Sequence, residues 1–334
     1  MGWVGVCFAL WLGMAAQAEE GLRRFTFERA EMGVPFRVTL FAAEEVAAQR
    51  AAEAALHRVW ELNGVLSDYD SDSELSQLSQ SSGQGKRVRV GEDLWRVLEF
   101  GQRMAVRSEG AFDLTVGPVV NLWRTARRKR ELPGEERLAE ALGRVGYGGV
   151  RLFPEDRSVE LQKPRMRLDA GGIAKGYAVQ EALRVLRGLG FGSAMVVGGG
   201  DMALGEAPVG ESGWRIEVPA LDAPGAPAPE VLTLKNVHVS TSGDRYQRLE
   251  RDGKRYSHVL DPRTGMALTD HSLVTVIASH GMEAEVLAKI LSVLGPEKGL
   301  PILEEIPGAA ARFVRAPEGR VEAFFSERWP REGR

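Results

Sequence analysis

The sequence has one cysteine in 334 residues, Cys7, which lies near the amino terminus. If the segment that contains it is removed, the mature chain has none. A chain without cysteine forms no disulfide, has no thiolate nucleophile and holds no cysteine-ligated zinc or iron site. Any chemistry must therefore come from other side chains. With 44% apolar residues, the chain is long enough to bury a full core.

A strong charge of one sign is also missing, since the formal net charge is −3. This balance gives no general attraction to nucleic acid or to a membrane surface. One basic run, RTARRKR from Arg124 to Arg130, has neither interleaved aromatic residues nor a known nucleic-acid module beside it. We predict no nucleic-acid partner and interpret the run as the solvated face of a helix.

No hydrophobic run reaches the length of a membrane span. The apolar run from Trp3 to Ala16 is uncharged and short, and Ala16-Gln17-Ala18 places small residues at cleavage-type positions. We predict that residues 1–18 are a signal peptide and that the protein is exported to the periplasm or another extracytoplasmic space. No Lys or Arg precedes the run, which leaves an N-terminal membrane anchor as the alternative. Cys7 lies too early in the run for a lipoprotein signal.

The sequence contains no internal repeat and no domain-scale linker, so residues 19–334 are expected to form one large domain. Short-period patterns over Phe25 to Phe41, broken near Met32-Gly33, predict two strands. Helically spaced apolar residues predict a long helix over Glu44 to Leu66. Strands and helices alternate without a βαβ rhythm, which favours an α+β fold of two intimately packed lobes, with antiparallel sheets and flanking helices. Further helices are predicted over Asp93 to Ser108, Glu135 to Val145, Ala178 to Leu189 and Met282 to Leu294.

The stretch LDAGGIAKGY, from Leu168 to Tyr177, has the composition of an anion site. Gly171 and Gly172 expose backbone N–H groups, the following helix adds partial positive charge, and Lys175 adds a full one. Asp169 requires a separate role, such as binding a ring N–H or orienting a metal ion or a nucleophile. The alternative is a glycine-rich turn between a strand and a helix, with a solvated lysine.

Three further features are candidates for the same site. The triplet Gly198 to Gly200 before Asp201 suits either a ligand lying on the backbone or a close strand crossing. Tyr69 is the only aromatic residue in the polar loop Ser67 to Ser82, where the simplest expectation is that it covers a core edge. Of the five histidines, only His258 lies in a cluster of potential site residues, and a single histidine is either structural or a proton acceptor.

Taken together, these segments resemble the FAD:protein FMN transferases, the ApbE-type flavin transferases, over nearly the whole mature chain. Co-occurrence of many blocks in one order is far more specific than any single block. The matching blocks are Met32-Gly33, Ser67 to Leu78, Gly110 to Pro118, Asp169 to Tyr177, Gly199 to Asp201, Ser240 to Asp244 and Tyr256 to Gly265.

The resemblance implies an enzyme that cleaves FAD at its pyrophosphate, attaches FMN through a phosphoester to a Ser or Thr of a partner protein, and releases AMP. The expected partner is an acceptor flavoprotein, such as a subunit of a membrane electron-transport complex. His258 is the implied acceptor of the hydroxyl proton, with Asp169 and Lys175 as further catalytic residues. The implied cofactor contacts are Met32, Tyr69, Ala111, Phe112, Asp113, Asp169, Lys175, His258 and Val259.

The resemblance also implies magnesium, held by the Gly172 carbonyl and by the last helix. In the family this helix reads Ala-Asp-Ala-Leu-Ala/Ser-Thr, whereas here Glu285 replaces the Asp and Lys289 replaces the Thr. Glu285 can still supply an oxygen, but Lys289 cannot ligate a metal while protonated. We predict weak magnesium binding, unless Lys289 turns to solvent as an ordinary helix partner of Glu285. A flavin carrier without chemistry and an FAD pyrophosphatase giving FMN and AMP are the alternative functions.

Overall fold

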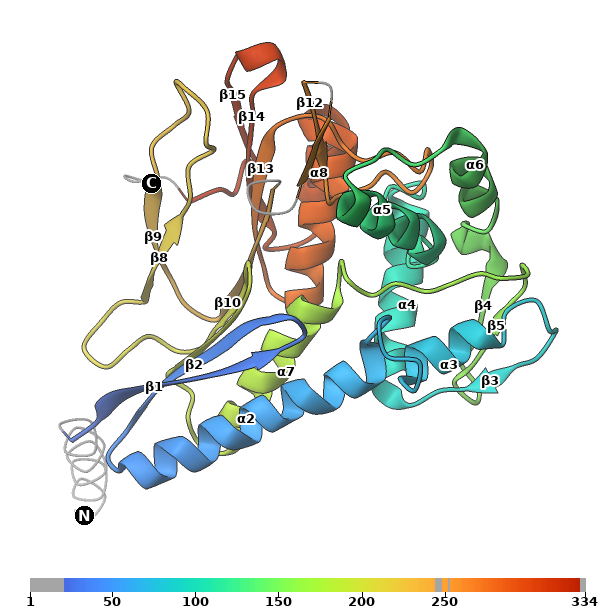
Figure 1. Cartoon of the computed structure of the whole chain (residues 1–334). Helices are drawn as coiled ribbons and strands as arrows, with labels where there is room; N and C mark the ends of the chain where they lie inside the picture. Colours follow the sequence, from blue (N-terminus) through green and yellow to red (C-terminus); the bar gives the residue numbers. More distant parts are fainter. Residues whose placement is uncertain (1–20, 244–247, 252, 331–334) are drawn as a thin grey trace, which may run out of the picture.

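The computed structural model describes residues 21–243, 248–251 and 253–330, so the predicted signal peptide and Asp244 lie outside it. Its main sheet has eight strands, and every neighbouring pair is antiparallel. This sheet runs through the left part of Figure 1. In sheet order the strands are β1 (Arg23–Glu31), β2 (Val34–Ala42), β6 (Ala194–Gly198), β7 (Asp201–Leu204), β10 (Val237–Gly243), β13 (Ser272–Ala278), β14 (Ala310–Arg315) and β15 (Glu322–Phe325).

Three helices pack on this sheet: α2 (Glu45–Leu66), α7 (Ala174–Gly188) and α8 (Gly281–Glu304). The core that they form with it also contains side chains from residues 75–104 and 150–161. Helix α7 contacts both α2 and α8 and lies between them (Figure 1). Every second residue of β2 from Phe36 to Ala42 is buried, as expected for a strand with one face on the core. The apolar positions predicted for α2 are buried too. The sheet and these helices form the first lobe.

The second lobe, at the right of Figure 1, contains further helices and a small sheet. Its helices are α3 (Glu74–Gln80), α4 (Glu92–Arg107), α5 (Gly117–Lys129) and α6 (Glu135–Gly143), and its sheet has the order β3 (Val88–Arg89), β5 (Ser158–Leu161), β4 (Val150–Phe153). The hairpin β11 (Arg248–Arg251) to β12 (Lys254–Ser257) joins its core, where the Trp123 and Tyr256 rings lie 5.7 Å apart. A second hairpin, β8 (Trp214–Val218) to β9 (Glu230–Leu234), packs on the main sheet.

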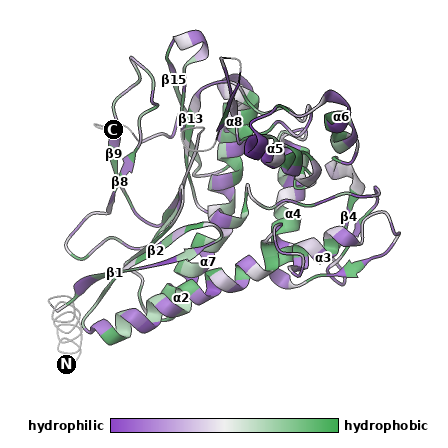
Figure 2. Ribbon diagram, viewed as in Figure 1, coloured by the Kyte–Doolittle hydropathy of each residue, from purple (hydrophilic) through white to green (hydrophobic). Residues whose placement is uncertain are grey.

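The α+β prediction is confirmed, and several boundaries follow local sequence signals. The predicted helix Met282 to Leu294 ends where α8 breaks, because Gly295 has a φ of 74° and Pro296 follows it. Figure 2 shows hydrophobic residues along much of α8 and mostly hydrophilic ones on α5. No helix in the described part of the chain is both long and apolar enough to cross a membrane.

Candidate active site

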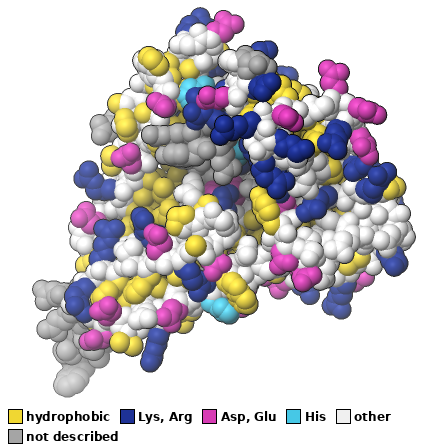
Figure 3. All heavy atoms as spheres, in the orientation of Figure 1, with side chains coloured by type: hydrophobic (Ala, Val, Ile, Leu, Met, Phe, Trp, Pro, Cys, Tyr) yellow, Lys and Arg dark blue, Asp and Glu magenta, His cyan; other side chains and the backbone are white. Residues whose placement is uncertain are grey.

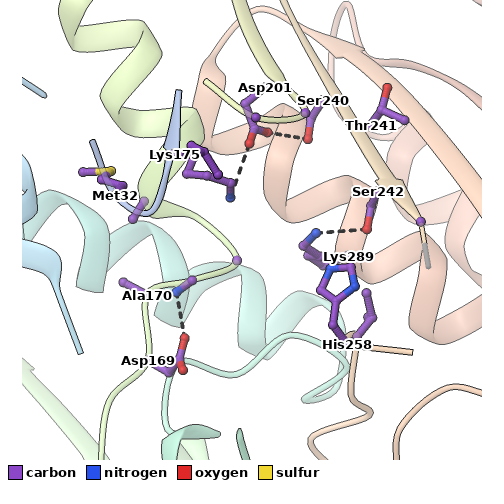
Figure 4. Close-up of a pocket in the computed structure, with 18 of the residues that line it drawn as sticks. Met32, Asp169, Ala170, Lys175, Asp201, Ser240, Thr241, Ser242, His258 and Lys289 are labelled. Carbon is purple, nitrogen blue, oxygen red and sulfur yellow. Dashed lines mark hydrogen bonds and ion pairs between the residues drawn. The ribbon is translucent and has the colours of Figure 1, made fainter. Parts of the chain in front are cut away.

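A cavity of about 1170 Å³ lies where the two lobes meet, lined by residues from the β1–β2 turn, the α2–α3 and β5–α7 loops, α5, α8 and β10. Every cofactor contact implied by the resemblance lines this cavity, although the residues come from distant parts of the sequence. Figure 4 shows Met32, Asp169, Lys175, His258 and Lys289 around its interior. Gly172 lines it as well, but Glu285 does not.

Met32 reaches the cavity because it lies in a two-residue hairpin turn. Glu31 pairs with Val34, so only Met32 and Gly33 connect β1 to β2. Both have positive φ, 49° and 76°, as the type I′ turn favoured in hairpins requires. Glycine accepts this conformation without strain, whereas Met32 is held in it. The turn therefore fixes a side chain at the rim of the site.

The loop before α7 is folded by Asp169. Its backbone N–H donates to the Leu114 carbonyl at 2.7 Å, and its Oδ1 accepts from the Gly171 N–H at 2.7 Å. The Gly171 N–H is therefore occupied, and the expectation that it faces a bound phosphate is wrong. Helix α7 begins at Ala174, so Lys175 is in its first turn, earlier than the predicted start at Ala178.

Arg124 of α5 connects this loop to the polar loop before α3. Its guanidinium forms ion pairs with Asp68 and, at 3.0 Å, with the Asp169 carboxylate. The same group lies 4.2 Å from the centre of the Tyr69 ring. Lys and Arg side chains gather over α5 in Figure 3, yet Arg124 and Arg127 both line the cavity. The prediction that the whole basic run is a solvated face is therefore wrong for these two residues.

Tyr69 does not cover a core edge, since 78% of its surface is exposed and its ring lies at the cavity. This corrects the simpler of the two expectations for Tyr69. Arg124 occupies one side of the ring, which leaves the other side for a planar ligand. The arrangement agrees with the ring-stacking role that the resemblance implies.

Burial, reinforced by the charge of Asp68, raises the pKa of Asp169 from 3.8 to about 6, and Arg124 opposes this rise. The folded chain thus holds the Asp169 proton more tightly than the unfolded chain. Folding is consequently weakened as the pH rises from about 4 to about 6, and the loss is complete above that window. Arg124 limits the loss because it compensates two buried carboxylates at once.

Replacing Arg124 with Leu is expected to lower the free energy of unfolding by roughly 3–5 kcal/mol at pH 7.5, because it leaves Asp68 and Asp169 buried without their cation. At pH 5 the loss should be smaller, since the two carboxylates can then share a proton. Urea unfolding at both pH values measures the difference. Arg128→Leu is the matched control, because Arg128 lies on the same helix but is exposed. An equal loss at both pH values would contradict the expected role.

Lys175 is the centre of a second ionic cluster. Its ammonium pairs with Glu285 and, at 3.3 Å, with Asp201, whose other oxygen accepts from the Ser240 hydroxyl at 2.6 Å. Burial alone would lower the pKa of Lys175, but Glu285 and Asp201 raise it above its ordinary value. Lys175 is therefore a compensated cation rather than the solvated lysine of the alternative interpretation.

Glu285 reaches Lys175 because α7 and α8 cross backbone to backbone. A Cβ added to Gly176 would lie 2.3 Å from the Gly281 carbonyl oxygen, so neither helix tolerates a side chain there. Glu285 then places Oε1 on Lys175 and accepts from the Gly176 N–H with Oε2 at 2.8 Å. Burial, with the charge of Asp201, raises the pKa of Glu285, and Lys175 opposes the rise.

Lys289 lies one helical turn after Glu285 but does not pair with it. Its ammonium donates to the Ser242 hydroxyl of β10 at 2.9 Å, and it lines the cavity (Figure 4). A Cβ added to Gly172 would lie 3.5 Å from the Lys289 Cγ, so the lysine stem lies beside that glycine. Burial and then the charge of Lys175 lower the pKa of Lys289. The alternative expectation, a helix ion pair between Glu285 and Lys289, is therefore wrong.

The residues implied for magnesium do not fit the ion. Both Glu285 oxygens already have donors, and the carboxylate lies below the cavity wall, 1% exposed. The Lys289 stem lies beside Gly172, the other implied ligand. Among the residues that the structure describes, no group of three or more His, Cys, Asp and Glu side chains could hold a metal ion.

The remaining residues that the resemblance implies as cofactor contacts are of two kinds. Two of them form part of the cavity wall, and one orders a loop beside it. Ala111 and Phe112 are buried against the wall, and the Phe112 ring would be 3.3 Å from a Cβ on Gly172. The Asp113 carboxylate accepts from Thr115 at 2.7 Å and from the Tyr147 N–H at 2.8 Å. Burial nevertheless raises the pKa of Asp113. Its carboxylate therefore orders the loop at the cavity wall.

His258 follows β12 and lines the cavity beside Val259. The Val259 N–H donates to the Ser257 hydroxyl at 3.1 Å, which fixes the local backbone. Asp261 is turned to Arg263, with an ion pair of 2.8 Å. Figure 4 shows the imidazole directed to the cavity interior. A base in this position can take a proton from a group bound inside.

Sequence reasoning missed Arg124, Arg127 and Asp68 as site residues. The available signal was weak: Arg124 and Arg127 are three apart, and both Trp123 and Ala126 on the same helix are buried. That spacing shows that two arginines of the run share one side of the helix, near its apolar stripe. It does not show which carboxylates they meet.

An α+β fold with a cavity lined by an exposed aromatic ring, glycine turns and several cations has the features of a site for an aromatic ligand that carries phosphate. Residues 32–313 match the ApbE family model, and the chain belongs to the ApbE family. It is 33% identical over 267 residues to an FAD:protein FMN transferase of Haemophilus influenzae, covering 78% of this chain and 77% of the relative. It is 32% identical over 314 residues to that of Treponema pallidum, covering 89% and 86%.

Solved structures agree with this assignment. The apo form of the Pseudomonas stutzeri flavinyl transferase ApbE superposes with a TM-score of 0.79 at 30% identity, covering 92% of this chain and 95% of that one. The flavin transferase ApbE from Vibrio cholerae gives a TM-score of 0.80 at 26% identity, covering 92% and 98%. Both similarities extend over both lobes.

Proposed function

We propose that this protein is an FAD:protein FMN transferase that moves FMN from FAD to a Ser or Thr hydroxyl of a partner flavoprotein. The observation that carries this proposal is that all the implied cofactor contacts line one cavity. In the reaction, the hydroxyl oxygen forms a bond to the FMN phosphorus. The bond from that phosphorus to the bridging oxygen breaks, AMP leaves with this oxygen, and the hydroxyl proton passes to His258.

The residues of this chain contribute mainly position and charge, which is what phosphoryl transfer requires. Tyr69 offers one ring face to a planar group, and Phe112 and Met32 add apolar surface to the same cavity. Asp169 holds the Gly171 backbone and Arg124 in place. Lys175 holds Asp201 and Glu285, and thereby fixes the first turn of α7.

Incubation of the mature protein with FAD and a Ser/Thr-bearing acceptor domain is expected to add one FMN to the acceptor, as intact mass will show. FAD at about 100 times its dissociation constant should also raise the free energy of unfolding by roughly 2.7 kcal/mol. Free FMN and AMP without an adduct would support hydrolysis. Binding without turnover would indicate the carrier, and the absence of any thermal shift with FAD would contradict all three.

The setting we propose is extracytoplasmic, with cleavage after Ala18 giving a mature chain of residues 19–334. The support is the short apolar run and the small residues at Ala16 and Ala18. The acceptor is then an exported or membrane-attached flavoprotein, such as a subunit of a membrane electron-transport complex. N-terminal sequencing of the exported protein tests the cleavage. Recovery of the uncleaved chain in the membrane would instead support the N-terminal anchor.

A further inference from the structure

The charged side chains of the cavity are not evenly compensated. Arg124 forms ion pairs with two carboxylates, those of Asp68 and Asp169. Lys175 likewise forms ion pairs with two carboxylates, those of Asp201 and Glu285. These two cations are surrounded by negative charge that neutralises them, so they contribute little net attraction for an anionic ligand.

Lys289 differs from both. No carboxylate in the described part of the chain lies within ion-pair distance of its ammonium, and its hydrogen bond goes to the neutral Ser242 hydroxyl. The ammonium lies on the cavity wall, and the stem packs beside Gly172 and hence near the glycine turn. An ammonium has three N–H donors, so two are open to a ligand after the Ser242 bond.

We propose that Lys289 is a built-in cation that binds a phosphate oxygen of the dinucleotide and takes the place of a divalent metal ion. This inference rests on the proposed function. The bridging oxygen of the pyrophosphate, which leaves with AMP, develops negative charge as its bond to the FMN phosphorus breaks, and a fixed cation beside it stabilises that charge. Lys289 supplies that charge from α8 without a bound ion.

The same contacts argue against a metal at this place. A divalent ion near Gly172 would be repelled by Lys289. Recruiting Glu285 as its ligand would also remove one of the two carboxylate partners of Lys175 and leave the Gly176 N–H without its acceptor. Glu285 and Gly176 are both buried, where a donor that loses its acceptor is strongly unfavourable.

The test measures binding to the mature full-length protein of three probes: FAD, riboflavin and inorganic pyrophosphate. Each is titrated by calorimetry with chelator and with magnesium. Wild-type affinity for FAD should change less than twofold between the two conditions. Lys289→Thr should weaken the binding of FAD and of pyrophosphate roughly 10- to 100-fold, because a charge-assisted hydrogen bond is lost. The affinity for riboflavin should not change, because riboflavin has no phosphate. Lys289→Arg should retain most of the affinity.

The matched control is Lys298→Thr, which removes an exposed lysine from the same helix and should change none of the affinities. As a second readout, the double variant Lys289→Thr with Glu285→Asp should acquire magnesium-dependent FAD binding. Wild-type FAD binding that is lost in chelator and restored by magnesium would overturn the inference, as would unchanged affinities in Lys289→Thr. Wild-type protein that binds pyrophosphate through Lys289 but does not bind FAD would overturn the proposed function alone.

Discussion

Replacing His258 with Ala is expected to slow FMN transfer by roughly 10²- to 10⁴-fold, the usual contribution of a positioned general base. The imidazole lines the cavity and is directed to its interior, and imidazole is the usual proton acceptor of enzymes. Binding of FAD should change far less than the rate. The measurement is the initial rate of FMN adduct formation by intact mass, with FAD affinity determined in parallel.

His57→Ala is the control for this experiment. His57 lies on α2, where its ring stacks on Trp60 with centroids 5.2 Å apart, and its side chain is 60% exposed. Its removal should leave transfer unchanged. If His258→Ala transfers FMN within tenfold of the wild-type rate, the proton goes elsewhere. If affinity falls as much as rate, His258 binds the cofactor and is not the base.

The parts of the fold that sequence predicts well are those fixed by neighbours along the chain. The turn at Met32-Gly33 requires positive φ, and a glycine after an otherwise alternating pattern signals it. The long helix α2 buries the same apolar positions that its periodicity indicates. In both cases the physical cause lies within a few residues, so no tertiary information is needed.

The ionic clusters could not be predicted in this way, because each joins segments far apart in sequence. Arg124 meets Asp68 and Asp169, which are 56 and 45 residues away. Only the packing of α5 against both loops brings these charges together. Taken by itself, the basic run predicts a solvated helix face, because most runs of this composition are solvated.

The contrast between Glu285 and Lys289 shows how tertiary packing overrides helix spacing. The two residues have the favourable order for an i, i+4 ion pair, which contributes only about 0.2–0.5 kcal/mol. The glycine crossing of α7 and α8 offers Glu285 a buried cation and a backbone N–H instead. Gly176 lies within the stretch that has the composition of an anion site, yet its lack of a side chain is needed for this helix contact.

Replacing Lys175 with Met should lower the free energy of unfolding by roughly 3–5 kcal/mol, because Glu285 and Asp201 then remain buried without their shared cation. The loss should be smaller at pH 5 than at pH 8, since burial already raises the pKa of Glu285 and protonation removes the uncompensated charge. Urea unfolding at both pH values provides the measurement, and Lys298→Met on the surface of α8 provides the control.

A second substitution separates this structural role from phosphate binding. Adding Glu285→Gln to Lys175→Met should recover part of the lost stability, because it removes one of the two unpaired carboxylates and keeps an acceptor for the Gly176 N–H. Stability equal to wild type in Lys175→Met, together with a large loss of FAD affinity, would reverse the assignment. Lys175 would then act as the phosphate ligand that its sequence motif suggests, and its pairing with Glu285 would contribute little to folding.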